Sequence, residues 1–443
     1  MKTYKEFFQY VLPSMLAFAL SGVYAIADGF FVGNAMGDTA LAAINVAYPL
    51  TALLQAIGTG LGMGGAIRYA ISMGSHDEKR GKRYFGMACI LLAISAIGLT
   101  VIYLFSTSIL LPMLGASGEI EIYANEYMLY ITLGAAFQIL GCGIVPFIRN
   151  MGSSILAMSS MIAGFLTNII LDYLFVWVFP WGMMGAAIAT VAGQAVTLIV
   201  CVFFLWRKQM LPVFHFEGKA KIYMKETIQV GLSPFGLTFS PNITLVLMNK
   251  SLAFYGGSVA VTCFAPISYV SSIILLLLQG VSDGAQPLLS LSYGEGKNEK
   301  VKKVRNIAYV FALIIGLLCM IVLFLFRSDI ALLFGASYAT SQQVAQLLPL
   351  FLSGYLCICI SRVTTAYFYA TNQNLIAYLL IYGEPLGLLA LLLALPNLFE
   401  LIGVWIAIPC SQLFAMLFSG LLLWLSFYQK TRKVKETGNV IKK

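Results

Sequence analysis

Charged side chains are scarce in this sequence. Asp, Glu, Lys and Arg make up 10% of the 443 residues, whereas hydrophobic residues make up 60%. An ordinary soluble domain carries about 25% charged residues, which cover its surface. The mean hydropathy is +0.88 and no long polar block interrupts the chain. These features exclude a sizeable soluble domain, and we predict that the chain lies in a membrane.

Residues that carry catalysis or hold metals are also few. The two histidines, His76 and His215, lie in polar loops, where neither a zinc site nor a Ser/His/Asp arrangement can be assembled. All eight cysteines lie in apolar runs, so we expect them to pack and not to form disulfides or bind metal. The sequence therefore predicts no enzyme activity and no cofactor.

Nucleotide-binding motifs are missing or misplaced. No G-x-x-x-x-G-K-[ST] loop is present, which excludes ATP hydrolysis within this chain as an energy source. The stretch "GTGLGMGG" contains G-x-G-x-x-G at Gly60, Gly62 and Gly65, but that pattern binds nucleotides only between a strand and a helix. Here it lies in an apolar run. Glycines four residues apart, such as Gly60 and Gly64, instead indicate close packing of membrane helices.

Twelve apolar runs are long enough to cross about 30 Å of hydrocarbon as helices. They lie near residues 8–33, 41–72, 86–113, 127–149, 155–179, 183–206, 227–252, 258–290, 305–327, 344–371, 375–396 and 401–427. The sequence therefore predicts an all-α integral membrane protein with twelve transmembrane helices.

Most of the 27 Lys and Arg residues fall in alternate connections between these runs. They gather at the N-terminus, in the "HDEKRGKR" and "GEGKNEKVKKVR" loops, between Arg207 and Lys225, and in the tail from Lys430. Connections rich in basic residues stay on the cytoplasmic side. We expect a multi-pass protein of the cell (plasma) membrane with both termini in the cytoplasm. This bias explains the net charge of +9 without a nucleic-acid partner.

The second half of the chain repeats the first at a shift of about 220 residues. Pro13 matches Pro234, Gly60 and Gly64 match Gly280 and Gly284, and Gln194 matches Gln412. Six crossings return the chain to its starting side, so the halves are parallel repeats. The expected domains are an N-terminal six-helix lobe (1–206), a cytoplasmic linker (207–226), a C-terminal six-helix lobe (227–427) and a basic cytoplasmic tail (428–443).

Polar side chains within the spans of the first half are the main functional candidates. Asp28 lies in the first span, Asn168 and Asp172 share one face of the fifth, and Thr190 lies in the sixth. An ionised acid at this depth in the membrane costs free energy unless it is paired with a cation, is protonated, or faces water. Two carboxylates, an amide and a hydroxyl can surround a hard cation such as Na+ or hold a proton. The alternative is that they only bond helix to helix.

The second half lacks these acids, because Asp28 aligns with Asn249 and Asp172 aligns near Leu392. We therefore expect the cation chemistry in the first half alone. Other polar or aromatic side chains could line a substrate cavity, and these candidates are Asp283, Glu384, Tyr24 and Arg362. Glu384 could instead simply pair with Arg362.

These motifs together resemble the multidrug and toxic compound extrusion (MATE) family, within it the MepA-like bacterial branch. The resemblance rests on "FVGNAMGDTALAA", "IRNMGSSILA", "TNIILDYLFV", "GMMGAAIATVAGQ" and "GAQPLLSLSYGEGK" and covers essentially the whole chain. It implies a MATE-like fold with two six-helix lobes. The family's ion-site positions carry over onto Asp28, Asn168, Asp172 and Thr190.

The resemblance also implies a function. It predicts a secondary active multidrug efflux antiporter that exports cationic amphipathic compounds in exchange for H+ or Na+ by alternating access. The expected partners are small cationic drugs or dyes and the lipid bilayer, and we expect a monomer. A flippase for lipid-linked precursors is the alternative, but it favours a cavity with several Arg and Lys side chains, and this chain offers only Arg362 and Lys250. An intramembrane enzyme is disfavoured because the spans contain no histidine.

Overall fold

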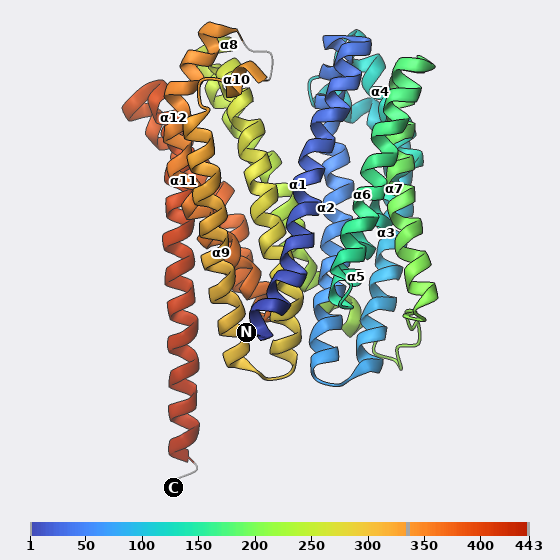
Figure 1. The fold of residues 1–443 in the computed structure, drawn as a ribbon, viewed down its shortest axis with the longest axis vertical. Helices are drawn as coiled ribbons and strands as arrows, with labels where there is room; N and C mark the ends of the chain where they lie inside the picture. Colours follow the sequence, from blue (N-terminus) through green and yellow to red (C-terminus); the bar gives the residue numbers. More distant parts are fainter. Residues whose placement is uncertain (1, 334–336, 441–443) are drawn as a thin grey trace. The chain divides into compact units, whose positions relative to one another are not determined.

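The computed structural model describes the backbone of residues 2–333 and 337–440 and the side chains of residues 2–332 and 337–428. Every regular element in these ranges is a helix (Figure 1). The elements are α1 (Lys2–Met36), α2 (Asp38–Gly74), α3 (Glu78–Met113), α4 (Glu119–Leu133), α5 (Ala135–Asn150), α6 (Ser154–Asp172), the π-helix η1 (Tyr173–Val178), α7 (Gly182–Arg207), α8 (Ala220–Gly294), α9 (Asn298–Leu325), α10 (Ile330–Leu333), α11 (Tyr338–Ala370) and α12 (Asn374–Val440). The prediction of an all-α protein is confirmed.

Two of these helices are each two membrane spans. A helix of 75 residues such as α8 would be about 110 Å long at 1.5 Å per residue, far more than a bilayer is thick. Both α8 and α12 are broken by one residue with non-helical backbone angles: Gly257 (φ 65°) in α8 and Glu400 (φ 48°) in α12. Glycine adopts such an angle at little cost. The chain therefore reverses at each break.

The number of spans agrees with the sequence. Among the described residues, nine helices are long and apolar enough to cross a membrane, and α4 with α5 makes a tenth across a 57° bend at Gly134. Dividing α8 and α12 at their breaks adds two. The fold thus has the twelve transmembrane helices that the hydrophobic runs predict.

The chain forms two compact units that differ from a simple division into halves. Unit 1 contains the residues up to Asn242 together with Leu275–Val304, and unit 2 contains Ile243–Ile274 and the residues from Arg305 onward. Parts of both spans of α8 therefore pack with the first half of the chain. The lobe boundaries expected from the sequence stay a prediction.

Glycines allow this packing within unit 1. A Cβ atom at Gly280 of α8 would lie 2.5 Å from Met15 Cα of α1, and one at Gly284 would lie 2.6 Å from Val11 Cα. The repeat-related Gly60 of α2 packs in the same way, because its Cβ would lie 2.8 Å from Phe235 Cβ of α8. The close helix packing that the glycine spacing predicts is confirmed, and it crosses between the two repeats.

Adding one methyl group at such a contact is expected to destabilise unit 1. We predict that Gly280→Ala lowers the melting temperature of the detergent-solubilised protein, because overpacking typically costs about 1–3 kcal/mol. The matched control is Gly420→Ala in α12, where no atom lies within 4 Å of the new Cβ. Equal melting temperatures for the two variants would contradict the close-packing explanation.

Candidate functional site

The polar residues singled out in the first half come together on three helices of unit 1. Helix α6 packs against α1 on one side and α7 on the other. Asn168 and Asp172 lie one turn apart at the end of α6, and their residues are 2% and 0% exposed. Asp28 of α1 and Thr190 of α7 reach the same place, because both interact with these α6 side chains. We call Asp28, Asn168, Asp172 and Thr190 the acid-pair site.

Oxygen atoms dominate this site. The Asp28 and Asp172 carboxyl groups interact directly, and Asn168 Nδ2 donates a hydrogen bond of 3.4 Å to Thr190 Oγ1. Among the described residues, no donor with good geometry reaches four buried oxygens: both carboxylate oxygens of Asp172, Asp28 Oδ1 and Asn168 Oδ1. Buried acceptors without donors are costly. A proton or a hard cation bound among these oxygens would supply the missing partner.

Two tyrosines complete the surroundings of the acid-pair site. The hydroxyl groups of Tyr24 and Tyr127 interact with Thr190, and both side chains are close to the two acids. The Tyr24 ring stacks on Phe165 of α6, with ring centroids 5.1 Å apart and planes 8° apart. The structure therefore brings Tyr24, a candidate for the substrate cavity, next to Asp28. Sequence reasoning missed Tyr127, because α4 contains three tyrosines and no signal separates this one from the others.

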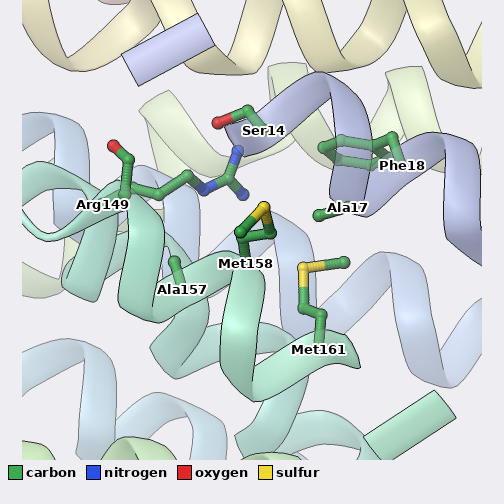
Figure 2. A pocket seen from close by; sticks show the side chains of 8 residues that line it. Ser14, Ala17, Phe18, Arg149, Ala157, Met158 and Met161 are labelled. Atoms are coloured by element: carbon green, nitrogen blue, oxygen red, sulfur yellow. The ribbon is translucent and has the colours of Figure 1, made fainter. Parts of the chain in front are cut away.

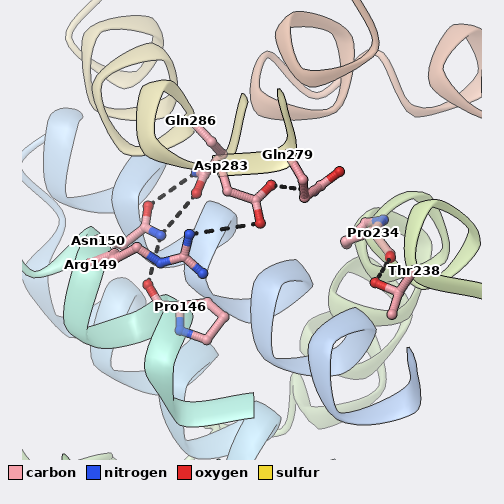
Figure 3. A network of polar contacts seen from close by, with 8 residues as sticks. All are labelled: Pro146, Arg149, Asn150, Pro234, Thr238, Gln279, Asp283 and Gln286. Atoms are coloured by element: carbon pink, nitrogen blue, oxygen red, sulfur yellow. Dashed lines mark hydrogen bonds and ion pairs between the residues drawn. The ribbon is translucent and has the colours of Figure 1, made fainter. Parts of the chain in front are cut away.

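Asp283, another cavity candidate, lies elsewhere in unit 1 and is paired (Figure 3). Its residue is 2% exposed, and its Oδ2 lies 3.7 Å from Arg149 Nη1 of α5. Gln279 Nε2 donates a hydrogen bond of 2.7 Å to Asp283 Oδ1. Next to this pair, the side-chain amides of Asn150 and Gln286 exchange hydrogen bonds of 3.0 and 3.1 Å. Together these contacts join α5 to the second span of α8.

Arg149 is held from its other side as well. Its guanidinium lies 5.7 Å from the centroid of the Phe18 ring of α1. It borders a crevice formed by α1, α5 and α6 that has no room for a water molecule (Figure 2). The crevice is lined by Ser14, Ala17, Phe18, Arg149, Ser154, Ala157, Met158 and Met161. Arg149 lies in the last turn of α5, yet its residue is only 5% exposed.

The remaining cavity candidates belong to unit 2. Arg362 lies in α11 with 7% of its residue exposed, and Glu384 is half-buried in α12. Within the part of the chain that the structure describes, no ion pair joins these two side chains. The alternative that Glu384 simply pairs with Arg362 is therefore wrong for this structure.

No metal centre of the usual kind accompanies these sites. The described residues contain no group of three or more His, Cys, Asp or Glu side chains that could hold a metal ion. The acid-pair site has two carboxylates only, and its other oxygens come from an amide and a hydroxyl.

Twelve spans with a buried oxygen site inside the helix bundle define a multi-pass membrane protein of the transporter class. The sequence model of the MatE family matches residues 13–174 and 235–389, one match in each half of the chain. The chain belongs to the MatE family. The two matches also agree with the predicted internal repeat.

Named relatives extend over nearly the whole chain. Multidrug export protein MepA of Staphylococcus saprophyticus subsp. saprophyticus is 24% identical over 432 residues, which cover 95% of this chain and 94% of the relative. MepA of Staphylococcus aureus strain MRSA252 is 26% identical over 424 residues, covering 93% and 92%.

Solved structures show the same fold. An outward-facing multidrug resistance MATE family transporter of the MOP superfamily superposes with a TM-score of 0.90 at 23% identity, covering 97% of both chains. A MOP superfamily transporter from Pyrococcus furiosus Vc1, described as having a binding pocket of reverse polarity, gives a TM-score of 0.89 at 23% identity and covers 95% of both chains. The expected MATE-like fold is confirmed.

The Arg149–Asp283 pair gives a prediction about stability. Removing one partner leaves the other charge buried, which costs about 3–5 kcal/mol. We expect Arg149→Met and Asp283→Leu each to lower the melting temperature clearly, and the double variant to be more stable than the sum of the two losses implies. The control is Lys302→Met, which breaks an exposed pair with Glu299 (2.8 Å) worth about 0.2–1 kcal/mol. Additive losses would show that the two side chains are not coupled.

Proposed function

We propose that the protein is a secondary active efflux antiporter that exports cationic amphipathic compounds in exchange for H+ or Na+ by alternating access. The observation that carries this proposal is the acid-pair site: two interacting carboxyl groups inside a membrane bundle, with four buried oxygens that no donor of good geometry reaches among the described residues. Membership of the MatE family and relatives named as multidrug export proteins support it.

In this mechanism the acid-pair site binds the coupling ion. Asp28 and Asp172 supply negative charge, and Asn168 Oδ1 and Thr190 Oγ1 supply neutral oxygens, a donor set that suits a hard cation. A proton shared between the two carboxyl groups would remove their mutual repulsion in the same way. An ion that enters from outside releases about 2.3 kcal/mol per charge per 100 mV of membrane potential. That energy can favour one access state over the other in each cycle.

The remaining features follow from the same proposal. Basic loops on one side support a plasma-membrane protein with cytoplasmic termini. Cationic drugs or dyes are the substrates, and one chain with both repeats acts as a monomer. The flippase alternative is not favoured, because the buried basic groups Arg149 and Arg305 are already engaged by Asp283 and by Asn306 and aromatic rings.

The identity of the coupling ion can be tested in proteoliposomes. Ethidium movement is recorded with an imposed Na+ gradient and no pH gradient, and then with the reverse. We expect one of the two gradients to drive transport against the ethidium gradient, because the site can hold either ion but only one need be exchanged. If neither gradient drives transport in folded, inserted protein, the antiport proposal is wrong.

The role of Asp172 can be separated from a structural one. Asp172→Asn keeps the size of the side chain but removes its charge, so we expect gradient-driven ethidium transport to fall to the passive level. The melting temperature should stay at or above that of wild type, because a buried acid is replaced by a neutral group. The control is Asn249→Ala at the repeat-related position of Asp28, which should retain transport. Retained transport by Asp172→Asn in proportion to folded protein would mean that Asp172 only bonds helix to helix.

A further inference from the structure

Helix α1 and the π-helix η1 pack together and are joined by a hydrogen bond close to the acid-pair site. The indole Nε1 of Trp177 in η1 donates to the backbone oxygen of Phe31 in α1 over 3.3 Å. The Trp177 ring also packs edge-on against the Phe31 ring, with centroids 5.6 Å apart and planes at 86°. The rings of Phe30 and Tyr173 lie beside the same indole, with centroids 6.2 and 6.1 Å away. One side chain of η1 therefore contacts α1 through a polar group and an aromatic face.

This contact lies next to both acids along their helices. Phe31 follows Asp28 by three residues in α1, and residues three apart share one side of an α-helix. Trp177 follows Asp172 by five residues, and η1 begins directly after Asp172. A π-helix pairs residues five apart, which places them one turn from each other. In a continuing α-helix, with about 3.6 residues per turn, Trp177 would instead lie about 140° around the axis from Asp172. The π-helix thus turns Trp177 toward the side of α6 that carries the acid.

A tryptophan near the end of a membrane helix is often only an interface anchor, whose N–H faces water or lipid headgroups. Trp181, just beyond η1, is held locally, because its ring stacks on Phe175 with centroids 4.4 Å and planes 16° apart. Trp177 and Trp181 are 44% and 42% exposed. At equal exposure, Trp177 gives its N–H to the backbone of another helix. It therefore links the two chain segments that carry Asp28 and Asp172.

We propose that Trp177 is a positioning residue for the coupling ion, because it holds α1 against the end of α6 where Asp28 and Asp172 meet. Two carboxylates without a cation repel each other, which drives the two helices apart. A contact that opposes this separation keeps the oxygens assembled before the ion arrives, and preassembled sites bind more tightly. This proposal rests on the proposed ion site and adds a residue outside it that sets the affinity of the site for the ion.

The variant Trp177→Phe tests this role, because it keeps an aromatic ring but removes the N–H donor. The rate of ethidium transport in proteoliposomes is measured against the concentration of the coupling ion. We expect the half-saturating concentration to rise about two- to tenfold, the effect of one lost hydrogen bond. The rate at saturating ion should stay near that of wild type. The control Trp181→Phe makes the same exchange away from α1 and should change neither quantity.

If the coupling ion is H+, the same loss moves the half-maximal rate to lower pH. Among the described residues, the titratable side chains that interact with the two acids are Tyr24 of α1 and Tyr127 of α4. Trp177 carries no charge, so its replacement acts through the distance between the acids and not through a changed local charge. If Trp177→Phe does not fold, Phe31→Leu removes the ring beneath the indole and should give a smaller shift in the same direction.

A binding measurement on purified full-length protein separates this inference from the efflux function. Melting temperature is followed in Na+ and pH titrations, because an ion that binds the folded state stabilises it; Asp172→Asn is the variant that lacks the site. A weaker ion response in Trp177→Phe than in wild type supports the proposal even if wild type moves no ethidium, in which case the efflux function itself fails. A melting temperature that falls equally at every ion concentration shows a structural role and overturns the proposal. So does an unchanged half-saturating concentration, an equal shift in Trp181→Phe, or no ion response in wild type.

Discussion

A charge inside the bilayer must be compensated, and this constraint organises the polar interior of the protein. The chain places few ionisable side chains within its spans, and each of the buried ones is a cost that the surrounding helices must offset. At the acid-pair site, helices α1, α6 and α7 bring two carboxyl groups together without a basic partner. In the proposed mechanism, a proton or a small cation completes this arrangement.

The buried acids of unit 1 have two kinds of partner. Asp283 has a permanent partner, because Arg149 and Gln279 reach its two oxygens from α5 and from α8 itself. Asp28 and Asp172 interact with each other and, in the proposed mechanism, take up an exchangeable cation. A permanent pair suits a joint between helices, whereas unmatched charges suit a site that binds and releases.

The sequence predicted much of the fold because hydrophobic length is a strong signal. Twelve apolar runs correctly predicted twelve spans. The glycine spacing at Gly60, Gly64, Gly280 and Gly284 correctly predicted close contacts between helices. The break at Glu400 had no comparable signal, since a left-handed backbone angle is unusual for glutamate. The division into compact units could not be predicted from the sequence, because it depends on contacts between helices that are far apart along the chain.

Spacing along one helix predicted part of the acid-pair site, whereas Asp28 and Thr190 were singled out by their polarity within apolar spans and by the family resemblance. Asn168 and Asp172 share a helix face, so their spacing alone places them together. Arg149 appeared as one more basic residue near a helix end, and nothing local indicates that it turns inward to Asp283. Tyr127 is one of three tyrosines on α4, and its proximity to Thr190 depends on how α4 meets α7.

The internal repeat explains why the two kinds of site can coexist. Both halves match the same family model, so the helices that carry Asp28 and Asp172 have counterparts that carry Asn249 and Leu392 instead. Arg362, in turn, corresponds at the repeat shift to Cys142 of α5, an uncharged residue. Duplication supplies two bundles of the same shape, and substitution at a few buried positions gives them different charges. In the proposed mechanism, the bundle in which Asp28 and Asp172 interact binds the coupling cation.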